Sequence, residues 1–85
     1  MWVVVAYDVS QDGRRQRLMN ALKDYGLPVQ KSVFECELAA ASFERMRARL
    51  LKLINARRDR LHFYRLCEQC RAKVEAYGAL KELKL

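Results

Sequence analysis

Asp8 is the residue of this chain whose type and position are best suited to chemistry. It directly follows the apolar run of residues 2–7 and precedes the polar, turn-prone residues 10–13. A carboxylate at the end of a buried strand is held rigidly from behind and is open to solvent in front. Hard cations such as Mg²⁺ prefer oxygen ligands and usually keep several waters. Because one carboxylate makes a poor metal site, this interpretation needs a second copy of the chain, and capping of the turn is the alternative.

Basic side chains gather in two segments of the sequence. Arg14, Arg15 and Arg17 crowd the start of a predicted helix, where cations oppose the helix dipole and a phosphate would be stabilised. The second group belongs to a second predicted helix and its exit: Arg45, Arg47, Arg49, Lys52, Arg57, Arg58 and Arg60. Such side chains would follow a sugar–phosphate backbone without reading its sequence. The alternative is a solvated surface, with Glu44 and Asp59 as local ion-pair partners of the second group.

The overall charge favours a polyanionic partner. The chain has 85 residues, with 17 Lys and Arg against 10 Asp and Glu, and a formal net charge of +7. A surplus of this size attracts phosphate polymers and anionic surfaces, and of these we favour nucleic acid. The hydrophobic fraction of 52% excludes a disordered tail. We expect one domain over residues 1–85, with a thin core that would gain from pairing with a second copy.

Neither an export signal nor a membrane segment is recognisable, so we expect a cytoplasmic protein without a membrane partner. The apolar run at residues 2–7 is too short to span a bilayer, and the cysteine count of three is odd.

The motif Cys67-x-x-Cys70 could belong to a zinc site or a redox site. A zinc site needs four ligands, and the only other soft candidates are Cys36 and His62. A redox motif would sit in a thioredoxin-like setting, which is absent. We therefore predict that Cys67 and Cys70 are buried structural thiols.

Hydrophobic periodicity predicts the elements that position these residues. Residues 2–7, rich in β-branched Val, predict a central strand that is buried on both faces. A helix over residues 14–25 follows, with Ser10 or Asp12 as its cap and Gly26 as its left-handed exit. The apolar face of this helix consists of Leu18, Ala21, Leu22 and Tyr25.

The middle of the chain predicts strand structure and a second helix. Residues 29–38 fit either one kinked strand or a very tight pair of strands. Ser42 is the predicted cap of the second helix. The apolar face of that helix consists of Phe43, Met46, Leu50, Leu53 and Ile54.

The last third of the chain completes an α+β fold. Residues 60–66 predict a strand with Leu61 and Phe63 on one face and His62 and Tyr64 on the other. A short strand is predicted at residues 74–77, and the tail of residues 79–85 could add to a sheet edge, including that of a partner copy. Two helices on one face of a small sheet give a ferredoxin-like βαββαβ sandwich, with an extra C-terminal strand at the dimer edge.

Three segments, in order, carry a resemblance over nearly the whole chain. They read VVVAYDVSQDGRRQRL, GLPVQKSVFECEL and RLHFYRLCEQCRAKVEAYG. Their combination of a Tyr-Asp at the end of the first strand, arginines opening the first helix and a Gln-x-Ser-Val-Phe-Glu run resembles the Cas-two family of CRISPR-associated proteins. The resemblance implies a ferredoxin-like fold and a homodimer whose sheets pack face to face. It also implies that Asp8 of each copy lies near the dimer axis and that the pair can hold Mg²⁺.

The resemblance further implies a function in acquiring new CRISPR spacers. In that function the homodimer bridges two dimers of the Cas-one integrase, and the assembly holds a protospacer DNA duplex. Family members are also described as metal-dependent nucleases that act on RNA or on double-stranded DNA. The positions that match the family's site residues are Tyr7, Asp8, Arg15, Arg17 and Phe34.

One segment departs from the family pattern. Some relatives carry Arg just before the Val-Gln pair, where this chain has Pro28 followed by Val29. An activity that depends on an arginine there is in doubt, and Lys31 replaces it only in part because an ammonium group lacks the planar fork. The residues we assign to nucleic-acid binding are Arg14, Arg15, Arg17, Lys31, Arg45 and Arg49.

Two functions from different classes use these residues. In the catalytic hypothesis, paired Asp8 carboxylates position Mg²⁺ while Arg15 and Arg17 hold the phosphates. In the architectural hypothesis, the basic surface clamps duplex DNA and the C-terminal tail docks the integrase. We favour the architectural function, with nuclease activity as a property of the isolated protein. A stand-alone metal-dependent ribonuclease of the virulence-associated D toxin type is a third alternative.

Overall fold

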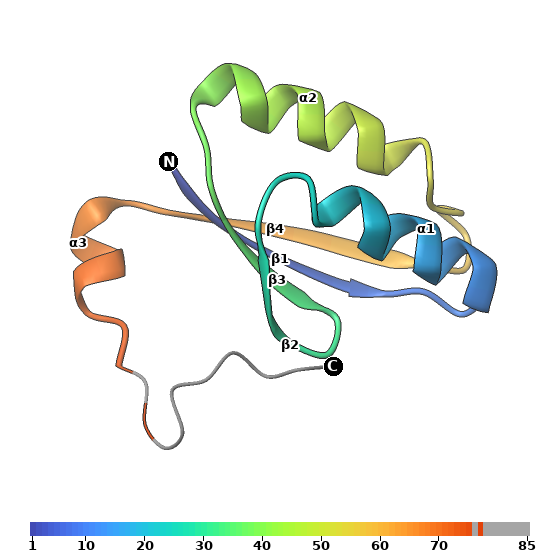
Figure 1. Cartoon of the computed structure of the whole chain (residues 1–85), viewed down its shortest axis with the longest axis horizontal. Helices are drawn as coiled ribbons and strands as arrows, with labels where there is room; N and C mark the ends of the chain where they lie inside the picture. Colours follow the sequence, from blue (N-terminus) through green and yellow to red (C-terminus); the bar gives the residue numbers. More distant parts are fainter. Residues whose placement is uncertain (76, 78–85) are drawn as a thin grey trace.

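The computed structural model describes residues 1–75 and residue 77 of the chain. Its elements, in chain order, are β1 (Trp2–Asp8), α1 (Asp12–Leu22), β2 (Leu27–Gln30), β3 (Val33–Glu37), α2 (Ala40–Leu51), β4 (Arg60–Leu66) and α3 (Glu68–Ala72). The first six follow the order βαββαβ, which confirms the predicted α+β, ferredoxin-like fold. The chain traces this order from blue to orange in Figure 1.

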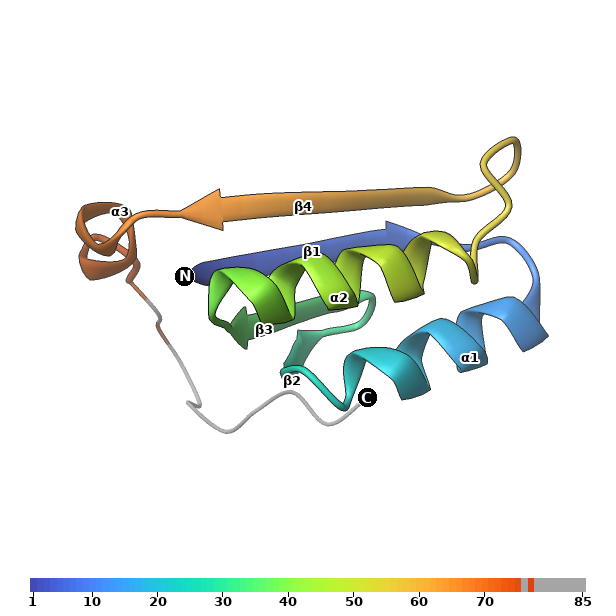
Figure 2. The same ribbon diagram turned by 90° about the horizontal axis from the view of Figure 1, so that it is seen from above.

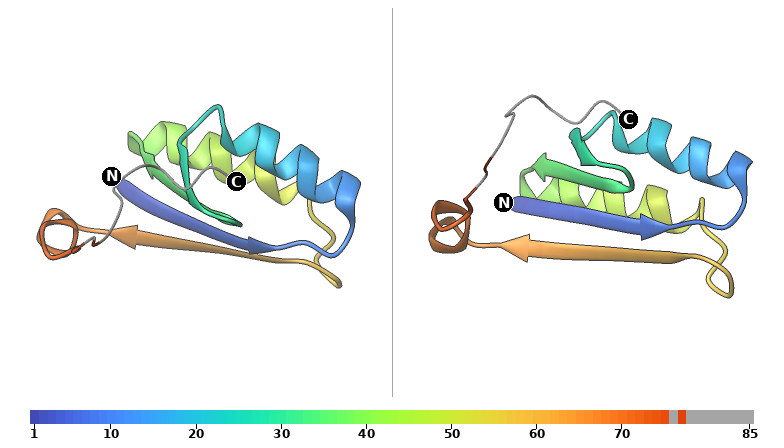
Figure 3. Two further views of the ribbon diagram at one scale, coloured as in Figure 1. Left: turned by 60° about the horizontal axis from the view of Figure 1, so that its bottom comes forward. Right: turned by 90° about the horizontal axis from the view of Figure 1, so that it is seen from below.

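A four-stranded antiparallel sheet in the order β2-β3-β1-β4 organises the fold. Helices α1 and α2 lie side by side over one face of this sheet (Figures 1 and 2). Figure 3 shows that no described element covers the opposite face, and that α3 continues from the end of β4 beyond the sheet. We call the helix-covered side of the sheet the covered face and the opposite side the open face.

Strand β1 lies in the middle of the sheet, as predicted, but only one of its faces is buried. Val3 and Val5 are fully buried on the covered face. Trp2, Val4 and Ala6 alternate with them, so these three point to the open face and stay partly exposed. The prediction of burial on both faces is therefore wrong for a single chain. The physical reason is that α1 and α2 both pack on the same side of the sheet.

The core lies between the covered face and the two helices. Its largest fully buried side chains are Phe34, Leu18, Leu22, Met46 and Leu50, which come from β3 and both helices. The predicted apolar faces of the helices are thus confirmed, except that Tyr25 packs against the core from beyond the end of α1. Leu53 and Ile54 also pack against the core, but they follow the end of α2 rather than belonging to it. Each large buried side chain contributes about 1.5–3 kcal/mol through loss of water-exposed apolar area.

Residues 29–38 form part of a tight β-hairpin, which decides between the two predicted alternatives. Strands β2 and β3 are antiparallel neighbours joined through Lys31 and Ser32. Ser32 has a φ of 71°, the left-handed conformation that lets two strands reverse within so few residues. The backbone N–H of Tyr7 donates to the Ser32 carbonyl at 3.1 Å, so the hairpin turn is tied to β1.

Both predicted helix caps are wrong. The N-cap of α1 is Gln11, whose side-chain oxygen accepts from the Arg14 backbone N–H at 2.6 Å. Ser10 does not take this position because its backbone N–H and hydroxyl are directed to Asp59. The N-cap of α2 is Ala39, which makes no side-chain capping bond, and Ser42 lies inside the helix.

Gly26 is required for close packing rather than for a left-handed helix exit, which corrects the sequence prediction. Helix α1 ends at Leu22, and its C-cap Lys23 has right-handed helical dihedral angles. A Cβ on Gly26 would lie 2.2 Å from the Glu35 carbonyl oxygen and 2.5 Å from Cys36 Sγ. Only glycine therefore lets the chain pass this close to β3.

The segment after β4 differs most from the sequence prediction. Val74, Glu75 and Tyr77 do not belong to a strand, residue 76 lies outside the described residues, and the short helix α3 precedes them. The predicted addition of residues 79–85 to a sheet edge also lies outside the described residues. Cys67 and Cys70 are exposed, so the prediction that they are buried is wrong, and Cys36 alone among the cysteines is buried.

None of the described helices has the length and apolar character needed to cross a bilayer.

The strand predicted at residues 60–66 is present as β4 with the predicted alternation. Leu61 and Phe63 pack against the core, whereas His62 and Tyr64 are exposed on the open face. This alternation decides which side chains of β4 lie beside Asp8.

Candidate functional site

Asp8 lies at the end of β1, on the open face, with its side chain exposed. Because side chains alternate along a strand, Asp8 shares this face with Trp2, Val4 and Ala6. In the antiparallel register of β1 and β4, Asp8 lies opposite Arg60. The predicted position of Asp8, supported by the sheet behind and open to solvent in front, is confirmed.

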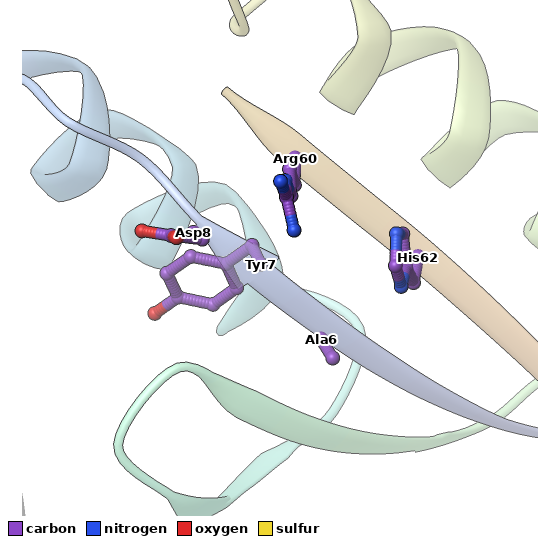
Figure 4. A pocket seen from close by; sticks show the side chains of 5 residues that line it. All are labelled: Ala6, Tyr7, Asp8, Arg60 and His62. Carbon is purple, nitrogen blue, oxygen red and sulfur yellow. The ribbon is translucent and has the colours of Figure 1, made fainter. Parts of the chain in front are cut away.

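A hollow of about 170 Å³ surrounds Asp8, lined also by Ala6, Tyr7, Arg60 and His62. Figure 4 shows these five side chains, three from β1 and two from the adjacent β4. The hollow brings a carboxylate, a guanidinium and an imidazole together. These groups can hold a hard cation, bind a phosphate oxygen and transfer a proton, respectively.

Arg60 and His62 line this hollow, although the sequence analysis does not assign either residue to the site. The sequence places Arg60 only in a general basic surface and offers His62 only as a soft metal ligand. The strand register brings them to Asp8, since Ala6 lies opposite His62 and Asp8 opposite Arg60. His62 Nδ1 also lies 3.2 Å from the Tyr64 hydroxyl, which orients the imidazole ring. The alternation of residues 60–66 was readable, but the register that pairs this strand with β1 was not.

The described residues of one chain do not form a metal site by themselves. Nowhere in residues 1–75 and 77 do three or more His, Cys, Asp or Glu side chains gather closely enough to bind an ion. Asp8 offers one exposed oxygen donor group, which suits Mg²⁺ in type but not in number. A magnesium site at Asp8 therefore depends on donors from a second copy and from water.

Tyr7 points away from this open side and belongs largely to the core, with 7% of its surface exposed. Its ring packs against Phe34 with centroids 6.5 Å apart. Burial raises the pKa of the Tyr7 phenol, while nearby Arg15 and a hydrogen bond with Ser32 act in the opposite direction. Phe34 is fully buried, so it supports Tyr7 and does not contact a ligand directly.

A second hollow, of about 220 Å³, lies on the other side of Tyr7. It is lined by Tyr7, Arg15, Gln16, Met19, Lys31 and Ser32. The structure thus brings together Tyr7, Arg15 and Lys31, three of the predicted site residues from three separate elements. Arg15 donates to the Val9 carbonyl at 3.1 Å and pairs with Asp12, which fixes its side chain at the start of α1.

Arg14 and Asp59 form a part-buried ion pair. Arg14 Nε donates to Asp59 Oδ2 at 2.8 Å, and a second guanidinium nitrogen donates to Oδ1 at 3.0 Å. The Asp59 carboxylate also accepts from the backbone N–H groups of Asn55 at 2.8 Å and Ser10 at 3.3 Å. The Arg14 guanidinium holds the pKa of Asp59 well below its usual range. This cluster ties the loop after β1, the start of α1 and the loop before β4 together.

The residues predicted to bind nucleic acid therefore divide into two groups. Arg14 and Arg15 have carboxylate partners, and Arg49 pairs with Asp24 at 2.7 Å. In the described part of the chain, three others form no ion pair: Arg17, Lys31 and Arg45. All three are exposed. Exposed cations without a carboxylate partner are the ones free to contact phosphates.

The geometry can be set beside known proteins. A family model described as CRISPR associated protein Cas2 matches residues 1–74. A Chloroflexus aurantiacus protein named CRISPR-associated endoribonuclease Cas2 1 is 40% identical over 79 residues, covering 92% of this chain and 85% of that protein. A Thermus thermophilus protein named CRISPR-associated endonuclease Cas2 2 is 42% identical over 80 residues, covering 94% and 87% of the two chains.

Solved structures agree with this match. The crystal structure of Streptococcus pyogenes Cas2 at pH 6.5 has a TM-score of 0.79 and 35% identity, covering 92% of this chain and 100% of that chain. The crystal structure of a hypothetical protein TT1823 from Thermus thermophilus has a TM-score of 0.81 and 40% identity, covering 92% and 90%. The similarity therefore extends over the sheet, both large helices and the Asp8 strand.

Proposed function

Because this chain belongs to the Cas2 (Cas-two) family of CRISPR-associated proteins, we propose that it acts as a homodimer that binds duplex DNA during spacer acquisition. In this proposal the dimer bridges dimers of the Cas-one integrase in the cytoplasm and holds the DNA through its phosphates. The observation that carries the proposal is an uncovered sheet face on a chain that also bears, in its described part, exposed cations without carboxylate partners. The proposal that the Cas-one integrase is a partner rests on the family resemblance and not on the geometry.

The open face supports the homodimer. One cross-strand row on this face runs through Leu27, Glu35, Val4 and Tyr64, one residue from each strand. Leu27 is 66% exposed and Tyr64 is 52% exposed, although both are large apolar side chains. A second copy packed against this row would remove that surface from water, and the domain is small enough to gain from it.

The unpaired cations support binding to the DNA backbone. Arg17 comes from α1, Lys31 from the β2–β3 turn and Arg45 from α2. Arg57 and Arg58 extend the group into the exposed loop before β4. Cations spread over several elements fit a long polyanion better than one small ligand, and they carry no base readout.

A metal-dependent nuclease is a second candidate function, favoured by the hollow at Asp8. In the dimer, Asp8 of both copies would hold one Mg²⁺, which when bound would neutralise charge on a scissile phosphate. Arg60 lies beside Asp8 and would bind a non-bridging phosphate oxygen. His62 lines the same hollow and would exchange a proton with the attacking water or the leaving oxygen.

The names of the matched proteins weigh against the toxin alternative. The relatives described above carry Cas2 names, and two of them are named as an endoribonuclease and an endonuclease. We therefore place the nuclease candidate within CRISPR immunity rather than in a toxin system. Whether RNA or DNA is the preferred substrate is decided by the assay below.

The DNA-binding proposal is tested with two double variants that change net charge equally. R17A/R45A removes cations that lack carboxylate partners, whereas R47A/R49A removes cations paired with Glu44 and Asp24. Fluorescence anisotropy with a labelled duplex, repeated over a salt series, gives the affinity and its salt slope. Each lost phosphate contact lowers the magnitude of that slope by about 0.9, so R17A/R45A, which removes up to four contacts from a dimer, should lower it by up to about 3.6. Equal losses in the two variants would contradict the proposal.

The nuclease candidate is tested with Asp8→Ala and the control Asp24→Ala. Asp24 is an exposed carboxylate that pairs with Arg49 on the helix side and does not line the Asp8 hollow. Each protein is incubated with single-stranded RNA and with duplex DNA, with Mg²⁺ or with chelator. Cleavage that is lost in Asp8→Ala and with chelator, but kept in Asp24→Ala, supports the nuclease. Cleavage that persists in Asp8→Ala contradicts it and leaves the DNA-binding proposal untouched.

The integrase proposal is tested by removing residues 79–85, which lie outside the described residues. The truncated protein should remain a dimer by sedimentation but should no longer co-elute with a Cas-one integrase. Normal co-elution of the truncated protein would contradict docking through the C-terminal tail.

A further inference from the structure

Cys67 and Cys70 lie at the end of the sheet that is farther from Asp8. Strand β4 begins at Arg60, opposite Asp8, and ends at Leu66, opposite Trp2. Cys67 follows immediately as the N-cap of α3, and Cys70 lies inside that helix. Both thiols are exposed. The function proposed above makes no use of either residue.

The two sulfur atoms are already in contact. Cys67 Sγ and Cys70 Sγ are 3.3 Å apart, and the Cys70 backbone N–H donates to Cys67 Sγ at 3.4 Å. Closing this distance to a covalent bond requires a movement of about 1.3 Å, which side-chain rotation within one helical turn can supply. The intervening Glu68 and Gln69 are exposed and do not obstruct it.

The two thiols are also chemically unequal, and both differ from the third cysteine. The hydrogen bonds from Cys70 lower the pKa of Cys67, whereas the neighbouring Cys67 sulfur raises the pKa of Cys70. Thiolates are the attacking species in thiol–disulfide exchange. Cys36 is 1% exposed, and burial raises its pKa to about 11, so it does not compete.

We propose that Cys67 and Cys70 form a reversible dithiol–disulfide couple that exchanges with low-molecular-weight disulfides such as oxidised glutathione. Metal binding by one chain is disfavoured, because no third His, Cys, Asp or Glu joins the two cysteines among the described residues and zinc sites need four ligands. The couple is independent of the Asp8 site, which lies at the other end of β4.

The exchange proceeds in two balanced steps. The Cys67 thiolate attacks one sulfur of the small disulfide, whose S–S bond breaks, and the released thiolate takes up the proton that Cys67 had lost. The Cys70 sulfur then attacks Cys67 in this mixed disulfide, and the second small thiolate leaves with the proton of Cys70. Two cysteine thiols are thereby oxidised by two electrons, and one small disulfide is reduced to two thiols.

The couple also lies where α3 is attached to the sheet. Arg71, next to Cys70, pairs with Glu37 at 2.8 Å and lies over the Trp2 ring at 5.1 Å. These contacts hold α3 against the start of β1 and the end of β3, so the two cysteines keep their mutual position. A held pair forms an intramolecular disulfide in preference to cross-linking with other molecules.

The test uses the full-length chain, reduced first and then equilibrated in buffers of defined ratio of reduced to oxidised glutathione. The protein is then unfolded in denaturant, the remaining thiols are trapped with a maleimide, and the intact mass and a peptide map are recorded. The expected product has lost two hydrogen atoms, carries a Cys67–Cys70 cross-link within one peptide, and retains one maleimide, on Cys36. Reduction by excess glutathione should reverse the change.

Two variants make the assignment specific. Cys70→Ser should stop at a stable mixed disulfide on Cys67, and Cys67→Ser should form a mixed disulfide at least about tenfold more slowly. Both changes lie on the exposed side of a short helix, so circular dichroism is expected to show an intact fold. A wild-type protein that accumulates mixed disulfides, or disulfides between chains, instead of the internal cross-link would overturn the proposal.

Discussion

The two faces of the sheet have the same strands but opposite properties. On the covered face, β1 and β3 present side chains that are fully buried in one chain, such as Val5 and Phe34. On the open face, β1 presents Val4 and Ala6, which are partly exposed, and Asp8, which is exposed. The covered face holds the single chain together, whereas the open face carries the surface and the carboxylate that a second copy would complete. The two-residue period of the strand thus separates the core of one chain from the surface that we propose for pairing with a second copy.

The largest expected effect is on the covered face. Phe34→Ala removes a fully buried ring from the middle of the core and should lower the free energy of unfolding by about 3–5 kcal/mol. Urea unfolding followed by circular dichroism measures this, at matched protein concentrations. Leu51→Ala is the control, because Leu51 is 52% exposed on α2 and should cost less than about 1 kcal/mol. Equal losses of unfolding free energy in Phe34→Ala and Leu51→Ala would contradict the distinction between the buried core and the exposed surface.

The next effect is on the open face and concerns association rather than folding. Val4→Lys puts an ammonium group into the row that a second copy would cover, opposite Glu35, which can pair with it in the monomer. The dimer dissociation constant should rise by about 100-fold, or about 2.7 kcal/mol. Sedimentation velocity over a concentration series measures it. If Leu51→Lys on the helix side weakens the dimer as much as Val4→Lys does, the open face is not the interface.

A smaller effect is expected at the Arg14–Asp59 ion pair, which braces the loops at the Asp8 end of the sheet. Asp59→Asn removes the charge and leaves Arg14 unpaired, so the melting temperature at neutral pH should fall by several degrees. Asp24→Asn, in an exposed ion pair with Arg49, is the matched control and should have little effect.

The pH dependence of this difference has a defined sign. The pKa of Asp59 is depressed in the folded protein, so its stabilisation is complete above the unfolded value of about 3.9 and is lost as the pH falls toward the folded pKa. The wild type should therefore approach Asp59→Asn in stability below about pH 4. A difference that is independent of pH in this range would show that charge is not the source of the stabilisation.

The smallest effect is expected for Arg47→Ala on the outer surface of α2. Arg47 pairs with Glu44 one helical turn away, and both side chains are about half exposed. Exposed pairs of this kind are screened by solvent, so unfolding should change by no more than about 0.5 kcal/mol. A loss above 1 kcal/mol in urea unfolding would mean that this surface contributes to folding, and the ranking of regions would have to be revised.

Much of the fold was predictable because burial follows local periodicity. The Val-rich run at residues 2–7 indicated β1, and the spacing of Leu18, Ala21 and Leu22 indicated the buried side of α1. The position of Asp8 at a strand end also followed from sequence alone. These features depend on residues close together in the chain, where spacing determines which side chains share a face.

The rest depended on partners that are distant in sequence. The register that brings Arg60 and His62 to Asp8 is set by pairing between β1 and β4. Ser10 does not cap α1, because it interacts with Asp59, which is 49 residues away in the sequence. The exposure of Cys67 was missed because β4 ends and α3 begins at that residue, where apolar spacing gives no signal.

In the function proposed for this chain, two copies bind one DNA duplex through its phosphates. Sedimentation velocity with a fluorescent duplex, run at low and at raised salt concentration, tests it directly. We predict a complex of two protein chains per duplex at low salt, weakened steeply as salt increases. A complex containing one protein chain, or binding that does not respond to salt, would contradict the claim.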